Sequence, residues 1–136
     1  MRTFLDSGVL ITAWKSVDKQ LAQSVIESPS RQPLTSETVR LELLPKPVFF
    51  RRQVELSFYE EILSRCECDR VDSGLYASAF NFAKRYGLAA ADAFNIASAV
   101  RLGAEEFITT ELPGKAVFRV KETRVVTLHA AASAET

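Results

Sequence analysis

The stretch that most constrains the fold runs from Gly87 to Glu111, GLAAADAFNIASAVRLGAEEFITTE. Apolar residues recur three and four positions apart in its first half, which predicts a helix, and Gly103 is well placed to end that helix. The residues at 107–109 are strand formers, and Pro113 with Gly114 prevents simple continuation of the strand. A helix, a glycine, a buried strand and a terminal acid together make one half of an α/β unit.

The rest of the chain alternates short strands and helices in the same way. Strands are predicted at residues 2–5, 33–35, 66–71, 116–118 and 124–128, and helices from about residue 9 and at 17–27, 36–44, 49–65 and 73–86. The stripe formed by Phe50, Val54, Phe58 and Ile62 is expected in the core, and the tail at 130–136 is expected to fray. This alternation predicts one α/β domain, residues 1–136, around a mainly parallel sheet.

The composition and charge of the chain limit the classes of function that it can have. The 17 basic and 17 acidic residues cancel, so nucleic-acid binding would require a local basic patch. No apolar run approaches the ~20 residues of a membrane span, and the N-terminus lacks the basic-then-apolar plan of a signal peptide, so we expect a cytoplasmic protein. Cys66 and Cys68 lie on one face of a predicted strand, which is poor geometry for a disulfide, and they are too few for a zinc site.

Four acids share a setting near the carboxyl ends of predicted strands: Asp6, Glu42, Asp92 and Glu111. Each is embedded in apolar sequence, although Asp6 taken alone is also a good helix N-cap. Isolated buried carboxylates cost several kcal/mol, so a group of four is tolerable when the acids are scattered, protonated or gathered around a metal ion. Hard oxygen ligands of this kind suit Mg²⁺ or Mn²⁺.

Polar neighbours of these acids can support such a site. Asn95 lies three residues after Asp92 and therefore on the same helical face, where its amide could hold a water or a phosphate oxygen. Ser7, Thr109 and Thr110 could position carboxylates through hydrogen bonds.

A resemblance to a known family is carried by FLDSGVLI, TSETVRLEL and AADAFNIASAVRLGAEEFITTE. In order and spacing these segments resemble the motifs of the PIN-domain ribonucleases, particularly the compact VapC-like bacterial proteins. The resemblance places the family's acids at Asp6, Glu42, Asp92 and Glu111, with Glu37 as an alternative for the second. It implies a PIN-like three-layer α/β/α sandwich and a divalent-metal-dependent endoribonuclease, in which Mg²⁺ or Mn²⁺ activates water for attack on RNA.

Two residues depart from the family pattern, and two alternatives stay open. Gly8 stands where the first motif commonly has Asn, and Glu111 stands where the last acid is often Asp. Both departures favour the alternative of a catalytically inert PIN-fold module that binds RNA or a protein. A more distant alternative is a receiver-like phosphorylation domain with Asp69 as its acceptor. The sole histidine, His129, has no nucleophile or base near it in sequence, so no role is predicted for it.

The resemblance also implies partners. VapC-like proteins are usually toxins restrained by a small antitoxin, and they are often homodimers. The adjacent Phe49 and Phe50 either form a partner-binding patch or anchor a loop on the core. Contacts with an RNA backbone need cations, and the candidates are Lys46, Arg51, Arg52, Lys84, Arg85 and Arg101.

Overall fold

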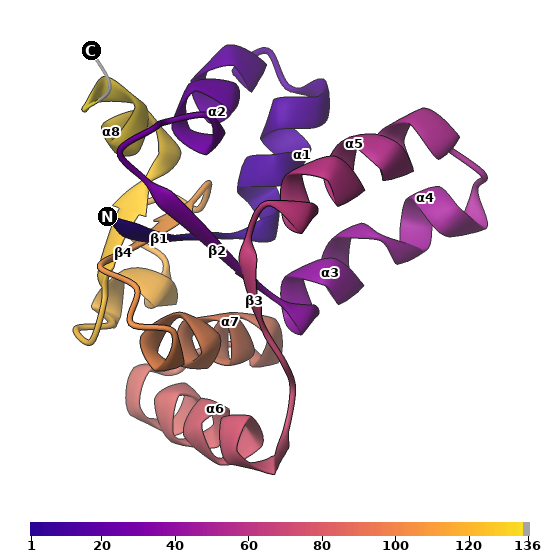
Figure 1. Ribbon diagram of the computed structural model, residues 1–136. Coiled ribbons are helices and arrows are strands. Elements are labelled where there is room, and N and C mark those ends of the chain that lie inside the picture. Colours follow the sequence, from indigo (N-terminus) through magenta and orange to yellow (C-terminus); the bar gives the residue numbers. More distant parts are fainter. Residues whose placement is uncertain (135–136) are drawn as a thin grey trace.

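A five-stranded parallel sheet lies between layers of helices in the computed structural model, which describes residues 1–134 (Figure 1). The strand order is β3-β2-β1-β4-β5, and every neighbouring pair is parallel. The predicted three-layer α/β/α sandwich is therefore confirmed. The receiver-like alternative is wrong, because β3 occupies the edge that β2 takes in that fold. The strands are β1 (Arg2–Leu5), β2 (Gln32–Ser36), β3 (Glu67–Asp69), β4 (Glu106–Thr109) and β5 (Arg124–Thr127).

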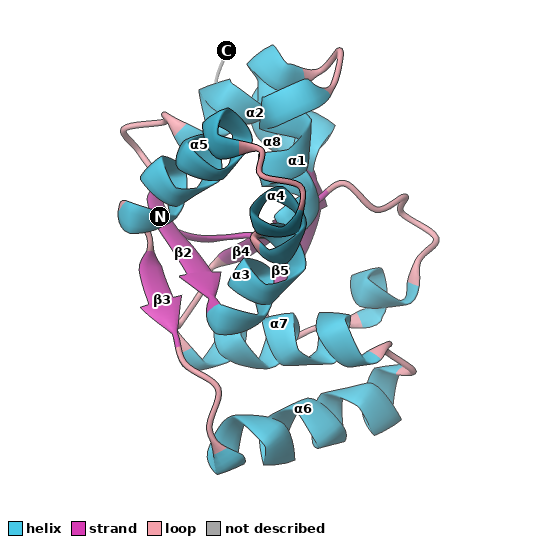
Figure 2. Ribbon diagram, turned by 90° about the vertical axis from the view of Figure 1, so that its right-hand side faces the viewer, coloured by secondary structure: helices cyan, strands magenta, loops and turns pink. Residues whose placement is uncertain are grey.

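Helices cover both faces of the sheet, as Figure 2 shows from the side. One face carries α1, α2, α5 and α8, whereas α6 and α7 cover the other, and α3 contacts both α1 and α7. No helix within residues 1–134 is long and apolar enough to cross a membrane. The helices are α1 (Ser7–Lys15), α2 (Lys19–Ile26), α3 (Glu37–Leu43), α4 (Pro45–Phe49), α5 (Gln53–Ser64), α6 (Ser73–Tyr86), α7 (Ala90–Arg101), α8 (Leu128–Ser133) and the 3₁₀ helix η1 (Ala116–Arg119).

The path of the chain reverses direction between β1 and β4. Successive connections lead from β1 outward to β2 and β3, and then α6 and α7 return the chain past β1 to β4 on the opposite side. Because crossover connections between parallel strands are almost always right-handed, this reversal places the two sets of helices on opposite faces. Open α/β sheets bind ligands at such a switch point, beyond the carboxyl ends of the strands. Asp6 directly follows β1 there, and Thr110 directly follows β4.

The core explains the tight packing at this point. Phe4 of β1 and Phe107 of β4 are completely buried register partners whose rings stack with centroids 5.1 Å apart. Several alanines of α7 are also buried, and their small side chains let α6 and α7 pack closely. As predicted, α7 ends just before Gly103, whose φ of 70° is the left-handed value that favours glycine.

Three predictions of local structure are wrong. The helix expected at 49–65 begins only at Gln53, and α4 forms at Pro45–Phe49, where a break before that helix was expected; Arg51, at a φ of 55°, lies between α4 and α5. Residues 116–118 belong to η1 instead of a strand. The tail does not fray from residue 130, because α8 extends to Ser133 and buries Ala131 and Ala132; residues 135–136 lie outside the described part. In each case tertiary packing overrides the local pattern.

The aromatic stripe predicted for the core is partly wrong. Phe50 and Val54 are 54% and 75% exposed, whereas Tyr59 is only 2% exposed and packs in the core. The break at Arg51 separates Phe50 from α5, so its position no longer follows the helical period of the residues after it.

Candidate active site

Asp6 occupies the switch point between β1 and β4. Its carboxylate is held from both sides, because the Ser7 backbone N–H donates to Oδ1 at 2.9 Å and the Thr109 hydroxyl donates to Oδ2 at 3.1 Å. The residue is 8% exposed. Asp6 therefore serves as the N-cap of α1 and at the same time presents a nearly buried carboxylate at the end of the sheet.

Glu42 reaches the same region from α3. The buried amide of Asn95, on α7, donates to Glu42 Oε1 at 2.9 Å and accepts from the Ser36 hydroxyl at 2.7 Å. Ser36 also caps α3, since its hydroxyl accepts from the Val39 backbone N–H at 3.0 Å. This chain of hydrogen bonds ties α3 to α7 and fixes Glu42 beside the helix that carries Asp92.

Asp92 and Glu111 complete the set. Asp92 lies in the first turn of α7, where the helix dipole favours an anion. Glu111 follows β4, and its backbone N–H donates to the Thr109 hydroxyl at 3.1 Å. The same threonine therefore contacts both Asp6 and the backbone of Glu111.

The four acids influence one another electrostatically. Burial, then the charge of Glu42 and more weakly that of Asp92, raises the pKa of Asp6 to about 7, against the opposing effect of its hydrogen bonds. Burial raises the pKa of Glu42, as does Asp92, while hydrogen bonds from Asn95 and Ser7 oppose the rise. Burial and the charge of Glu111 raise the pKa of Asp92. Acids from four separate segments thus form one coupled acid cluster.

The acid cluster has no cationic partner among the described residues. The ion pairs within residues 1–134 involve none of its four acids. Nor are any three Asp, Glu, His or Cys side chains in that part of the chain arranged to hold a metal ion jointly. Carboxylate oxygens are the donors that Mg²⁺ and Mn²⁺ prefer, so the donor set fits these ions in chemistry.

Gly8 has a structural reason in this chain. A Cβ built at Gly8 would lie 2.2 Å from the Thr110 hydroxyl oxygen and 3.3 Å from its Cβ. Thr110 thus occupies the space that a longer side chain at position 8 would need. The glycine at position 8, where the family motif commonly has Asn, leaves room for the Thr110 side chain that follows β4.

A double substitution tests this pairing. Gly8→Ala should raise the free energy of unfolding by about 0.5–1 kcal/mol in a Thr110→Ala background, because alanine is the better helix residue. In the wild-type background the clash with the Thr110 hydroxyl should cancel or reverse that gain. Urea denaturation of the four proteins measures the difference. Equal effects of Gly8→Ala in both backgrounds would contradict the pairing.

Basic residues gather beside Glu42. Lys15, Lys46 and Arg52 line a pocket of about 340 Å³ that also contains Glu42 and Glu55. Lys46 and Arg52 were among the predicted cations, whereas Lys15 was missed because it lies on α1, far away in sequence. Its three cations outnumber its two acids, although Arg52 pairs with Glu55 at 3.7 Å, so the pocket carries a small excess of positive charge next to one member of the acid cluster.

Two of the other four predicted cations, Arg51 and Arg101, lie elsewhere. Arg51 is exposed in the turn between α4 and α5. Arg101 lies at the far end of α7 from Asp92, where its guanidinium pairs with Asp69 at 3.0 Å and Asp72 at 2.9 Å. It therefore ties α7 to the connection between β3 and α6.

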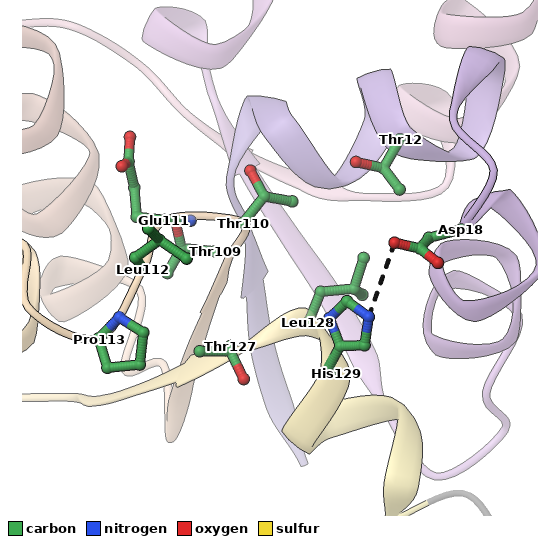
Figure 3. Close-up of a pocket in the computed structure, with 10 residues that line it drawn as sticks. All are labelled: Thr12, Asp18, Thr109, Thr110, Glu111, Leu112, Pro113, Thr127, Leu128 and His129. Carbon is green, nitrogen blue, oxygen red and sulfur yellow. Dashed lines mark hydrogen bonds and ion pairs between the residues drawn. The ribbon is translucent and has the colours of Figure 1, made fainter.

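A second pocket, of about 400 Å³, extends from Glu111 (Figure 3). Its opposite end is formed by Asp18 and His129, which lie 3.6 Å apart. Sequence reasoning did not single out Asp18 and predicted no role for His129. These residues reach one pocket through the packing of α2 against α8.

Comparison with known proteins agrees with this geometry. A family model described as PIN domain matches residues 3–111, a span that contains the whole acid cluster. No curated protein matches the chain.

Solved structures with the same fold come from bacterial complexes. A chain of VapBC2 from Rickettsia felis, bound to a DNA fragment from its promoter, matches with a TM-score of 0.69 and 15% identity over 93% of this chain and 98% of that one. A chain of a toxin–antitoxin complex from Klebsiella pneumoniae gives 0.71 and 20% over 93% and 97%. DNA-bound VapBC from Salmonella typhimurium gives 0.68 and 15% over 94% and 98%.

At these identities the structural likeness shows a shared fold. The family model adds membership, because its match covers most of the sequence and begins within β1. The resemblance predicted from the three sequence motifs is confirmed. The chain belongs to the PIN domain family.

Proposed function

We propose that this protein is a divalent-metal-dependent endoribonuclease that hydrolyses RNA phosphodiester bonds. The observation that carries the proposal is the acid cluster, in which burial and mutual repulsion raise the pKa values of Asp6, Glu42 and Asp92 and none of the four acids forms an ion pair within the described residues. A cation bound from solution would relieve that repulsion. Mg²⁺ or Mn²⁺ would supply activation of water and compensation of phosphate charge.

The residues of the site have distinct roles in this proposal. Asp6, Asp92 and Glu42 hold the metal, and Glu111 approaches it from the segment after β4. Thr109 and Ser7 orient Asp6, and the role of Asn95 is to hold Glu42. Metal binding would draw together carboxylates that are separated in the described arrangement.

The basic pocket supplies the electrostatic attraction for RNA. Lys15, Lys46 and Arg52 can contact backbone phosphates while the scissile phosphate lies at the acid cluster. Because the net charge of the chain is zero, this local patch must account for the attraction. Arg101 contributes less, since Asp69 and Asp72 neutralise it.

The biological setting is proposed from the similar structures. One is described as a toxin–antitoxin complex, so we place this protein as the toxin of such a pair, active on cytoplasmic RNA and restrained by a small antitoxin. Exposed apolar side chains on α3 to α5, among them Leu41, Phe49 and Phe50, offer a surface for that partner or for a homodimer.

Cleavage of labelled single-stranded and structured RNAs tests the proposed activity. Wild-type protein should cut RNA with Mn²⁺ or Mg²⁺ and stop in EDTA. Asp92→Asn should lower the rate by roughly 100-fold or more, as expected when a group that stabilises the transition state is removed. Glu60→Gln, on the exposed side of α5, serves as the matched control and should cut normally.

A thermal measurement separates this proposal from the inert-module alternative. Metal binding to the folded state should raise the melting temperature of the wild type and have a smaller effect on Asp92→Asn. The inert PIN-fold module would be favoured if the well-folded protein binds RNA without cutting it and neither metal changes its melting temperature.

A further inference from the structure

The pocket between Glu111 and the Asp18–His129 pair has walls of three chemical kinds. Hydroxyls come from Thr12, Thr110 and Thr127, and apolar surface comes from Leu112, Pro113 and Leu128. Asp18, His129 and Glu111 supply the ionisable groups (Figure 3). A volume of about 400 Å³ falls within the range of small-molecule pockets. The pocket therefore has room for one nucleoside with both polar and apolar contacts.

The pocket is continuous with the acid cluster. Thr109 lines the pocket, and its hydroxyl donates to Asp6. Glu111 also lines the pocket, and its charge raises the pKa of Asp92. A group that fills the pocket thus lies next to the acids proposed to act on the scissile phosphate.

The charge of the pocket selects the kind of group that can enter. Its carboxylates, Asp18 and Glu111, have no Lys or Arg beside them among the described residues that line it, whereas the pocket beside Glu42 sets Lys15, Lys46 and Arg52 against Glu42 and Glu55. Phosphates are therefore favoured in the basic pocket over this one. Carboxylates and hydroxyls accept hydrogen bonds, so the pocket suits the N–H and O–H groups of a base and a ribose.

The Asp18 carboxylate faces the pocket and not the helix backbone. Asp18 stands at the N-cap position of α2, where an aspartate ordinarily accepts from the helix backbone, yet its side chain makes no capping hydrogen bond. Its backbone is nevertheless fixed, because its N–H donates to the Ser16 hydroxyl at 3.0 Å and its carbonyl accepts from the N–H of Leu21 and of Ala22. The carboxylate instead lies at the pocket wall, 3.6 Å from His129 Nε2.

We propose that this pocket binds the nucleoside beside the scissile phosphate and that Asp18 makes it selective for guanine. The inference rests on the proposed RNA cleavage. Guanine presents two neighbouring donors, N1–H and the N2 amino group, which match the two oxygens of a carboxylate. Adenine places an acceptor at N1, which a carboxylate repels. Bases of single-stranded RNA are read through such edges, and one bidentate contact distinguishes bases by roughly 10- to 100-fold.

Cleavage of matched oligoribonucleotides tests the role of Asp18. The substrates are adenine-rich single strands with one guanine, the same strands with inosine in its place, and strands with neither. Wild-type protein with Mn²⁺ should cut next to guanine roughly 10-fold faster than next to inosine, which lacks the N2 amino group. Asp18→Asn offers only one acceptor and should cut guanine and inosine strands at equal rates. Asparagine remains a good N-cap residue, so this variant should fold.

Binding of mononucleotides tests the pocket without cleavage. His129 is the only histidine, so its imidazole signals in NMR spectra report on the pocket unambiguously. In metal-free wild-type protein, guanosine monophosphate should shift these signals more strongly than inosine or adenosine monophosphate. Asp18→Asn should remove the difference, and Glu60→Gln should retain it.

The outcomes separate this inference from the proposed function. Metal-dependent cleavage with no preference for guanine, together with equal responses to the three mononucleotides, would overturn the guanine pocket and leave the nuclease intact. Selective binding of guanosine monophosphate by a protein that cuts no RNA would support the pocket and contradict the nuclease.

Discussion

Replacing Asp6 by Asn is expected to stabilise the metal-free protein at about pH 8 while it abolishes RNA cleavage. Asp6 has a pKa of about 7 in the folded protein, against 3.8 for an unperturbed aspartate. The folded state therefore holds the Asp6 proton more tightly than the unfolded state does. By linkage, the protein loses stability as pH rises from about 4 to about 7. One pKa unit corresponds to about 1.4 kcal/mol, so Asn should recover a few kcal/mol above that range.

The direction of this stability change distinguishes Asp6, whose pKa is raised, from an acid whose pKa is lowered by its partners. Chemical denaturation in EDTA at about pH 8 should show the gain, and the gain should vanish at about pH 4. Asp72→Asn is the matched control, because hydrogen bonds from Arg101 lower the pKa of Asp72. Asp72→Asn should reduce stability at about pH 8, with the reduction fading as pH falls. A destabilised Asp6→Asn protein at about pH 8 would contradict the raised pKa of Asp6.

Metal addition should reverse the ranking of the two proteins. Wild-type protein should gain the free energy of metal binding, whereas Asp6→Asn would lack one of the proposed carboxylate ligands. A melting curve with and without Mn²⁺ therefore measures what the Asp6 carboxylate costs in stability without metal and what it gains with metal. The same ranking of the two proteins with and without Mn²⁺ would contradict a metal-binding role for Asp6.

The sequence predicts the fold well where the chain repeats a simple physical pattern. The period of α7 and the glycine after it locate that helix and its C-terminal end, and the alternation of elements predicts the parallel sheet. Prediction from the sequence fails where the backbone changes direction and no local residue pattern marks the change. Arg51 adopts a positive φ that is uncommon for a residue other than glycine, asparagine or aspartate, so the break between α4 and α5 carries no recognisable sequence mark.

The same distinction applies to the candidate site, where some residues can be predicted from the sequence and others cannot. The motif resemblance selects the four acids. The structure brings them near one another because each acid follows a strand or lies on a helix that packs at the strand ends. Lys15 and Asp18 carry no such mark, since each resembles an ordinary exposed residue near the end of a helix. They reach the two pockets only because α1 and α2 pack beside α5 and α8. Pocket residues of this kind require the tertiary arrangement.

Glu106 is a buried acid of a different kind, and Glu106→Ala is expected to lower the free energy of unfolding by roughly 3–5 kcal/mol. Its side chain is 1% exposed and pairs with Arg31, itself 6% exposed, at 2.6 Å. The Thr3 hydroxyl donates to the same Glu106 oxygen at 2.8 Å, and Arg124 lies 3.6 Å from the other. Alanine removes a buried carboxylate that pairs with a buried guanidinium and leaves the Thr3 hydroxyl without that acceptor, which costs far more than the loss of an exposed ion pair.

Two variants isolate the charge effect at Glu106. Glu106→Gln keeps the shape and an oxygen for Thr3 but loses the charge, so it should fall between alanine and wild type. Glu60→Ala, in an exposed position, should change stability little. Guanidinium chloride denaturation measures all three, and a loss below about 1 kcal/mol for Glu106→Ala would contradict the paired-charge argument. Glu106 begins β4, so it lies at the amino ends of the parallel strands, opposite to the end that carries Asp6. The fraction of Glu106→Gln protein that stays folded should therefore cut RNA at the wild-type rate.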